Sequence, residues 1–217
     1  SESLIAITTG FSGTDVLLFG TTNGIGDVVV VVRGPVDLVT VRRKERVAGI
    51  WINTSSLIFD GVPGYYRLAA SREVNTLLDD EIRNTFQIGV ENIATAPLDT
   101  LTPEEEKQFF DALIRNKKRE GLYGSESGVV SFLGKRLFRT RISLPANVPT
   151  GQYTVEVFLV VDGKVVNRTT TPLQVLKSGF EEQVYTFAHE RSALYGLIAI
   201  AIALVAGWFA GFVFRKV

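Results

Sequence analysis

Near its C-terminal end the chain carries a long uninterrupted apolar run, residues 194–214, built only from aliphatic and aromatic residues, glycine and alanine. At a rise of about 1.5 Å per residue, a helix of roughly 21 residues is about 31 Å long, which matches a bilayer hydrocarbon core of about 30 Å. A buried core helix of this kind would need a far larger protein around it. We therefore predict one transmembrane helix over residues 193–214.

The charges on the two sides of this run indicate an orientation. Arg215 and Lys216 follow the run directly, whereas Arg191 and the more distant Lys177 precede it. Positive residues close to a span favour the cytoplasmic side. We predict a cytoplasmic C-terminal tail and a folded domain on the outer side of the membrane.

Small residues recur along one face of the predicted span. Gly196, Ala199, Ala203, Gly207 and Gly211 lie three or four positions apart, and the last two form a GxxxG motif. Small side chains at this spacing let two helix backbones approach closely in lipid. We interpret these residues as a helix-packing interface.

The rest of the chain is typical of β-structure interrupted by turns. Runs rich in valine, isoleucine, leucine and threonine predict strands over residues 4–8, 15–19, 27–33, 38–43, 137–144, 153–161 and 164–176. Val28 to Val32 are apolar on both faces, which predicts a central strand, and Asp162-Gly163 predicts a hairpin turn. Tyr153 is expected to pin the corner before its strand, as in immunoglobulin-like sandwiches. The aromatic residues Trp51, Tyr65, Tyr66 and Tyr123 are expected to be core and corner residues rather than platforms for a ligand.

Helical signals interrupt the strands. Thr102 as N-cap, Pro103, Glu105 three residues after the cap and Gly121 as the stop predict one helix. A shorter helix is expected over residues 77–86. The predicted fold is mainly β, an immunoglobulin-like β-sandwich with a helical insertion. Its expected parts are 1–73 (first part of the sandwich), 74–127 (helical insertion), 128–180 (last strands), 181–192 (juxtamembrane linker), 193–214 (transmembrane helix) and 215–217 (cytoplasmic tail).

The composition argues against enzymes and nucleic-acid-binding proteins. The chain has no cysteine, a single histidine and 23 residues of each charge. It therefore offers no thiolate and no multi-histidine metal site, and it has no net positive field. The histidine, His189, adjoins the apolar run and is interpreted as an interfacial polar residue. We expect no catalytic, cofactor-binding or metal-binding residues.

Two further patterns have structural explanations. Acidic clusters at residues 79–81 and 104–106 coincide with expected helix N-termini, where negative charge is favourable. The segment Gly24-Ile25-Gly26-Asp27 superficially matches a phosphate-binding loop, but it precedes a strand rather than a helix. We expect a hairpin turn there.

One local concentration of charge has two explanations. Arg42, Arg43, Lys44 and Arg46 surround a single acidic residue, Glu45. They could contact lipid headgroups or an acidic partner. They could equally protect a sheet edge from aggregation, and both explanations stay open.

The chain resembles the putative transmembrane protein family of alphaproteobacteria. The resemblance is carried by residues 9–13, 26–35, 41–44 and 49–53, and it continues through 59–71, 137–153 and the C-terminal run. It implies a signal peptide removed before Ser1, a periplasmic domain and a single-pass anchor in the bacterial inner membrane. It implies no activity and no catalytic residues.

The preferred functional hypothesis is a non-enzymatic accessory subunit, anchored in the membrane and docked on an integral membrane protein or complex. Such a partner could be a sulfite-exporter-like permease or a respiratory or photosynthetic complex. An alternative is a periplasmic ligand- or metal-binding module that serves a transporter, which would need convergent polar groups. A third hypothesis is a homodimer that packs through Gly207 and Gly211.

Overall fold

A computed structural model describes residues 4–7, 11–47, 49–99 and 101–177, together with residues 189, 192, 195, 196, 200 and 203–208 of the C-terminal segment. The chain divides into two compact units. The first comprises Ser1–Ile5 and Phe11–Leu176, and the second Ala6–Gly10 and Lys177–Val217.

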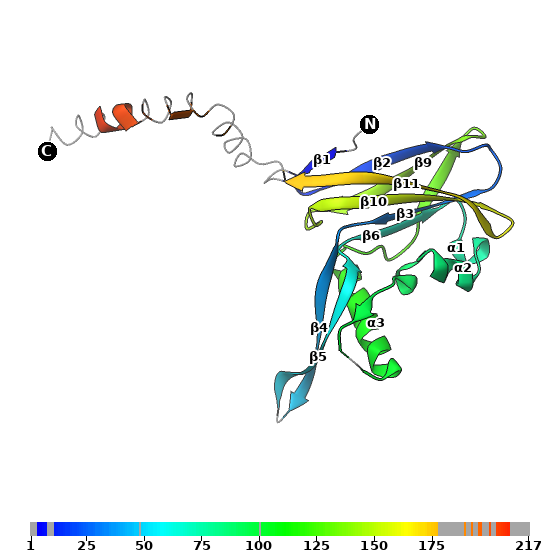
Figure 1. The fold of residues 1–217 in the computed structure, drawn as a ribbon, viewed down its shortest axis with the longest axis horizontal. Coiled ribbons are helices and arrows are strands. Elements are labelled where there is room, and N and C mark those ends of the chain that lie inside the picture. Colours follow the sequence, from blue (N-terminus) through cyan, green and yellow to red (C-terminus); the bar gives the residue numbers. More distant parts are fainter. Residues whose placement is uncertain are drawn as a thin grey trace. The chain divides into compact units, whose positions relative to one another are not determined.

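Most strands join one eight-stranded curled sheet (Figure 1). In spatial order its strands are β1 (Leu4–Ile7), β11 (Lys164–Lys177), β10 (Gly151–Val161), β3 (Asp27–Arg33), β6 (Tyr66–Ala70), β8 (Gly128–Leu133), β9 (Leu137–Pro145) and β2 (Gly13–Thr21). β6 and β8 pair in parallel, whereas β10–β11, β3–β10, β3–β6, β8–β9 and β2–β9 are antiparallel. The predictions of a mainly β fold and of the hairpin turn at Asp162-Gly163 are confirmed.

The curl places β2 and β9 against the central strands. A cavity of about 210 Å³ is lined both by Thr21 and Phe138 from this pair and by Val157 and Asn167 from β10 and β11. The segment Gly24-Ile25-Gly26-Asp27 therefore joins strands that do not pair with each other, and the expected hairpin turn there is wrong. An immunoglobulin-like sandwich has two separate sheets, whereas here the β6–β8 pairing makes the sheet continuous. That finer description stays a prediction.

β3 lies at the centre of the sheet, as predicted. Val28 to Val32 are all buried, because one face of β3 meets the curl and the other meets a layer of short helices. The helical layer comprises α1 (Val74–Leu77), α2 (Asp80–Thr85) and the 3-10 helix η1 (Val90–Asn92). The short helix expected over 77–86 is confirmed by α2 over 80–85, but it begins later than expected, because Leu78 is extended and buried and separates α1 from α2.

A long hairpin leaves the curled sheet and forms a second, three-stranded sheet (Figure 1). It consists of β4 (Val36–Val47) and β5 (Ile50–Pro63), with β7 (Ala96–Pro97) on the outer side of β5. The helix α3 (Pro103–Arg119) packs on this sheet through Phe109 and Leu113, which meet Val41, Leu57, Phe59 and Val62. Thr102 and Glu105 form the predicted capping box at its start.

A buried carboxylate links three strands of the curled sheet. Glu156 on β10 forms ion pairs with Arg33 on β3 and with Arg168 on β11. The Nη2 atom of Arg33 also donates to the carbonyl oxygens of Phe86 (3.0 Å) and Gln87 (2.8 Å). Burial lowers the pKa of the Arg33 guanidinium from its ordinary value. The cluster thus connects the sheet to the helical layer.

The C-terminal segment is described only at scattered positions. Gly196, Ala203 and Gly207 are helical, whereas Ala199, Gly211, Arg215 and Lys216 lie outside the described residues. Within the described positions, none of the helices reaches the length and apolar character that crossing a bilayer requires. Most of the predicted span over 193–214 lies outside the described residues.

We predict that Glu156→Gln lowers the free energy of unfolding by about 3 kcal/mol, because it leaves two arginines beside a neutral group that is 2% exposed. Denaturant unfolding of the purified chain, monitored by circular dichroism, measures this loss. Glu45→Gln, at an exposed position, is the matched control and should change stability by less than about 0.5 kcal/mol. Equal stability of the two variants would contradict a structural role for the cluster.

Candidate functional site

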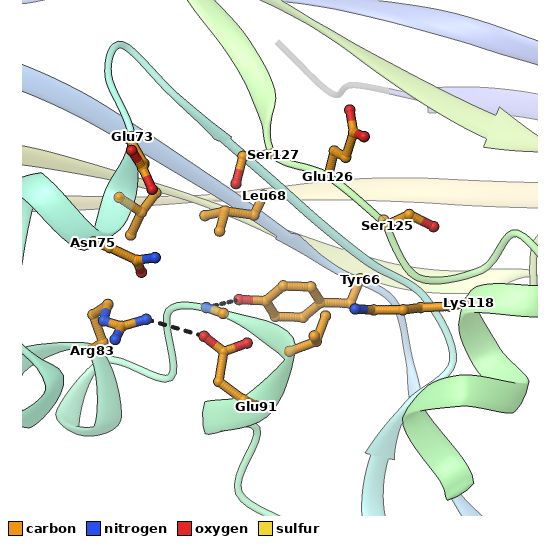
Figure 2. A pocket seen from close by; sticks show the side chains of 14 residues that line it. Tyr66, Leu68, Glu73, Asn75, Arg83, Glu91, Lys118, Ser125, Glu126 and Ser127 are labelled. Carbon is orange, nitrogen blue, oxygen red and sulfur yellow. Dashed lines mark hydrogen bonds and ion pairs between the residues drawn. The ribbon is translucent and has the colours of Figure 1, made fainter. Parts of the chain in front are cut away.

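A polar cleft of about 250 Å³ lies between the helical layer and the segment that follows α3 (Figure 2). One wall carries Glu73 and Asn75 and the other carries Ser125, Glu126 and Ser127, with Arg83, Glu91 and Lys118 at the sides and Tyr66 between them. These residues come from segments far apart in the sequence. Three carboxylates and two cationic groups therefore line one small space.

The Tyr66 hydroxyl holds the turn at one side of the cleft. It donates to the carbonyl oxygen of Gln87 (3.0 Å) and accepts from the backbone N–H of Gly89 (2.8 Å). Both residues have positive φ, +53° at Gln87 and +104° at Gly89. Glycine adopts this conformation readily, whereas at Gln87 it is strained, and the hydrogen bond to the Gln87 carbonyl oxygen helps to hold it. Burial raises the pKa of Tyr66 to about 12, so the hydroxyl stays protonated.

Arg83 orients the acidic groups on its side of the cleft. Its Nη1 lies 3.1 Å from Oε1 of Glu91, and its Nη2 pairs with Asp80. Its Nε is buried and has no hydrogen-bond partner among the described residues. Arg83 is thus held by two carboxylates, which leaves Glu73, Glu126 and Lys118 as the charged groups without a described ion pair in the cleft.

The cleft is lined by ionisable groups of both signs. Its lining contains neither histidine nor cysteine, and its tyrosine stays protonated. No group of three histidine, cysteine, aspartate or glutamate side chains with metal-binding geometry occurs in the described part of the chain. A volume of about 250 Å³ lies below the range of drug-sized pockets, which begins at about 300 Å³. It fits a small polar ligand.

The basic residues of the sequence analysis lie on the β4–β5 hairpin. Arg43 is engaged by α3, because its Nη2 donates to Oε1 of Gln108 (2.8 Å) and its guanidinium lies 4.8 Å from the Phe109 ring centroid. Arg42, Lys44 and Arg46 are exposed. The structure therefore separates one anchoring arginine from three exposed cationic side chains.

Three of the four aromatic residues named in the sequence analysis are buried, and the fourth is exposed. Tyr65, Tyr66 and Tyr123 are buried, as expected. The core position expected for Trp51 is wrong, since 67% of its surface is exposed at the end of the hairpin. The apolar segment 50–52 was misleading because it has the composition of a buried strand. The sequence did contain one indication that residues 50–52 are exposed: they follow the basic run directly, on the other side of the turn at Gly49.

The described part of the small-residue series has an open surface. A Cβ atom placed on Gly196 or Gly207 would meet no described atom within 4 Å. Among the described residues, nothing therefore limits the size of a side chain at these two positions. The cleft residues, by contrast, were not found from the sequence, because nothing in their spacing indicates that they converge.

A comparison with known protein families finds a match over almost the whole chain. The family described as "Putative transmembrane protein (Alph_Pro_TM)" matches residues 1–216. The searches of curated proteins and of solved structures find no match.

We predict that Tyr66→Phe lowers the free energy of unfolding by about 1–3 kcal/mol, because it removes both hydrogen bonds and leaves a buried N–H group unpaired. The amide of Gly89 should also exchange with solvent faster. The hydroxyl's contribution is fully present below pH 10 and is lost as the pH rises through about 12.

Tyr153→Phe is the comparison for this prediction. The Tyr153 hydroxyl donates to the carbonyl oxygen of Pro149 (2.5 Å), the predicted corner contact. Its loss should reduce stability without a selective effect on the Gly89 amide. Unchanged exchange at Gly89 in Tyr66→Phe would show that the hydroxyl does not restrain the turn.

Proposed function

Because the chain belongs to the Alph_Pro_TM family of putative transmembrane proteins, we propose that it is a non-enzymatic accessory subunit, held in the membrane by one helix over residues 193–214. The helix and the β-rich domain together dock on an integral membrane protein or complex. The single observation that carries this proposal is the series of small residues on the helix.

The physical argument rests on association inside lipid. Water does not drive apolar helices together there, so close backbone approach and dispersion contacts must hold them. Gly196 and Gly207, at which a Cβ atom would meet no described atom, suit such an approach. Ala199, Ala203 and Gly211 extend the same spacing. Permeases and respiratory or photosynthetic complexes all offer helices for this contact.

The proposed topology places the β-rich domain in the periplasm and Arg215 and Lys216 in the cytoplasm of a bacterial inner membrane. The positive residues after the apolar run support this orientation. Protease added to intact spheroplasts should then digest the domain and leave a membrane stub. A protected domain would reverse the orientation.

We predict that Gly207→Leu or Gly211→Leu releases the chain from its partner without impairing insertion, because leucine blocks close approach yet favours the membrane by a few tenths of a kcal/mol. Affinity purification in mild detergent, with quantitative mass spectrometry, should show at least a tenfold loss of the partner. Self-association of differently tagged copies in the same experiment tests the homodimer.

Ile198→Leu, which lies off the small-residue face, is the matched control and should retain the partner. Carbonate extraction checks that all three variants remain in the membrane. Equal partner recovery from the three variants would show that the helix only tethers the domain.

A second candidate function, a periplasmic ligand-binding module that serves a transporter, is favoured by the cleft. Its mixed charges, with the carboxylates of Glu73 and Glu126 and the amine of Lys118 in one lining, match a small zwitterion such as a free amino acid. Equilibrium dialysis of the full chain with labelled glycine, alanine and serine tests this function. Binding that is lost in Lys118→Gln and retained in Lys135→Gln would support it, and no binding at millimolar concentration would reject it.

A further inference from the structure

The end of the β4–β5 hairpin exposes three consecutive large apolar side chains. The exposed fractions are 68% for Ile50, 67% for Trp51 and 45% for Ile52. Single exposed apolar residues are ordinary on protein surfaces, but a contiguous group at a projecting end usually marks an interaction site. We call these three residues the hairpin tip.

No other described element covers the hairpin tip. The contacts of the hairpin with α3 reach Arg43, which bonds to Gln108 and lies over Phe109. Beyond this point, residues 44–46 and 49–53 are all exposed. Figure 1 shows the end of the hairpin extending past α3. The hairpin tip is therefore available to a partner outside the described chain.

Basic side chains lie beside and behind the hairpin tip in a defined register. Arg46 is directly opposite Trp51, Lys44 is opposite Asn53, and Arg42 is opposite Ser56. At about 3.3 Å per residue, Lys44 lies about 7 Å behind Trp51 along the strands, and Arg42 about 13 Å behind it. The hairpin thus has an apolar end that includes one cation, Arg46, followed by Lys44 and Arg42 and then by its contact with α3.

This arrangement matches the layers of a bilayer surface. Interfacial segments bury apolar side chains about 5–10 Å deep, which is the separation between Trp51 and Lys44. Tryptophan is enriched at that depth, and lysine and arginine near a membrane surface attract anionic headgroups. Glu45 is the only acidic residue within residues 42–53. We propose that the hairpin tip inserts into the interface of a bilayer containing anionic phospholipids.

The alternative explanations account for less of the arrangement. Charges that protect a sheet edge would explain Lys44 and Arg46, but exposed Ile50, Trp51 and Ile52 make such an edge more prone to aggregate. An acidic protein surface would pair with the cations and would leave the apolar residues in water. An anionic bilayer presents charge and apolar depth in the order that the hairpin requires.

The two tryptophans of the chain make the proposal directly testable. In the full chain with Trp208→Phe, all tryptophan fluorescence comes from Trp51. The chain is reconstituted in phosphatidylcholine vesicles with or without 30 mol% phosphatidylglycerol, containing brominated or ordinary acyl chains. In the anionic vesicles, we expect brominated chains to reduce Trp51 emission at least twofold and acrylamide to quench it poorly. In vesicles without phosphatidylglycerol the lipid quenching should be weaker.

Charge reversal provides the matched variants. In the Trp208→Phe chain, Lys44→Glu with Arg46→Glu should at least halve the lipid quenching of Trp51. Lys135→Glu with Lys164→Glu reverses two exposed lysines at other turns and should leave it unchanged. Circular dichroism confirms that each variant is folded. Equal loss in both pairs would overturn a specific role for the hairpin cations.

The reciprocal variant separates this proposal from the membrane anchor on which the proposed function depends. In Trp51→Phe, Trp208 reports on the predicted span. If brominated chains quench Trp208 while Trp51 stays unquenched and open to acrylamide in anionic vesicles, the insertion of the hairpin tip is overturned and the anchor stands. If they quench Trp51 and not Trp208, the hairpin tip inserts and the proposed span is wrong.

Discussion

The ion pairs formed by the carboxylate of Glu156 are the interaction on which most of the described domain depends. The carboxylate forms ion pairs with Arg33 and Arg168 on the two strands that neighbour β10, inside a sheet where an unpaired charge would be very costly. Arg33 in turn donates to the carbonyl oxygen of Gln87, which also accepts from Tyr66. A continuous series of polar contacts therefore runs from the centre of the sheet to the side of the cleft, and the shape of the cleft depends on a distant ion pair.

Buried tyrosine hydroxyls fix the remaining connections. The hydroxyl of Tyr65 donates to the carbonyl oxygen of Ser143 (2.7 Å), and so joins the start of β6 to β9 across the curl. The hydroxyl of Tyr123 donates to the carbonyl oxygen of Pro63 (2.8 Å), and so joins the segment after α3 to the end of β5. Each side chain combines a large apolar surface with one hydrogen bond to an irregular segment. This explains why the loops around the curled sheet have defined positions without disulfides.

The sequence predicted the features that depend on local chemistry. The capping box at Thr102 and the central position of Val28 to Val32 follow from residue types within a few positions, and both are confirmed. The length of the hairpin, the exposure of Trp51 and the convergence of Glu73, Lys118 and Glu126 depend on contacts between distant segments. Periodicity carries no information about these contacts. Local residue types likewise predict a helix at Leu78. The structure differs there because the burial of Leu78 in the core outweighs its local helical preference.

The equal numbers of acidic and basic residues give no indication of the electrostatic potential at any one place on the surface. Equal numbers of acidic and basic residues exclude a strong global attraction to anionic surfaces. At physiological salt, however, charges act only over about 8 Å. The potential at the hairpin tip is therefore set by Lys44 and Arg46, with Glu45 between them, and hardly at all by the distant carboxylates that make the total zero. A chain with no net charge can consequently carry a hairpin that is cationic and ends in apolar residues. The electrostatic potential of its surface must therefore be considered over distances comparable to the screening length.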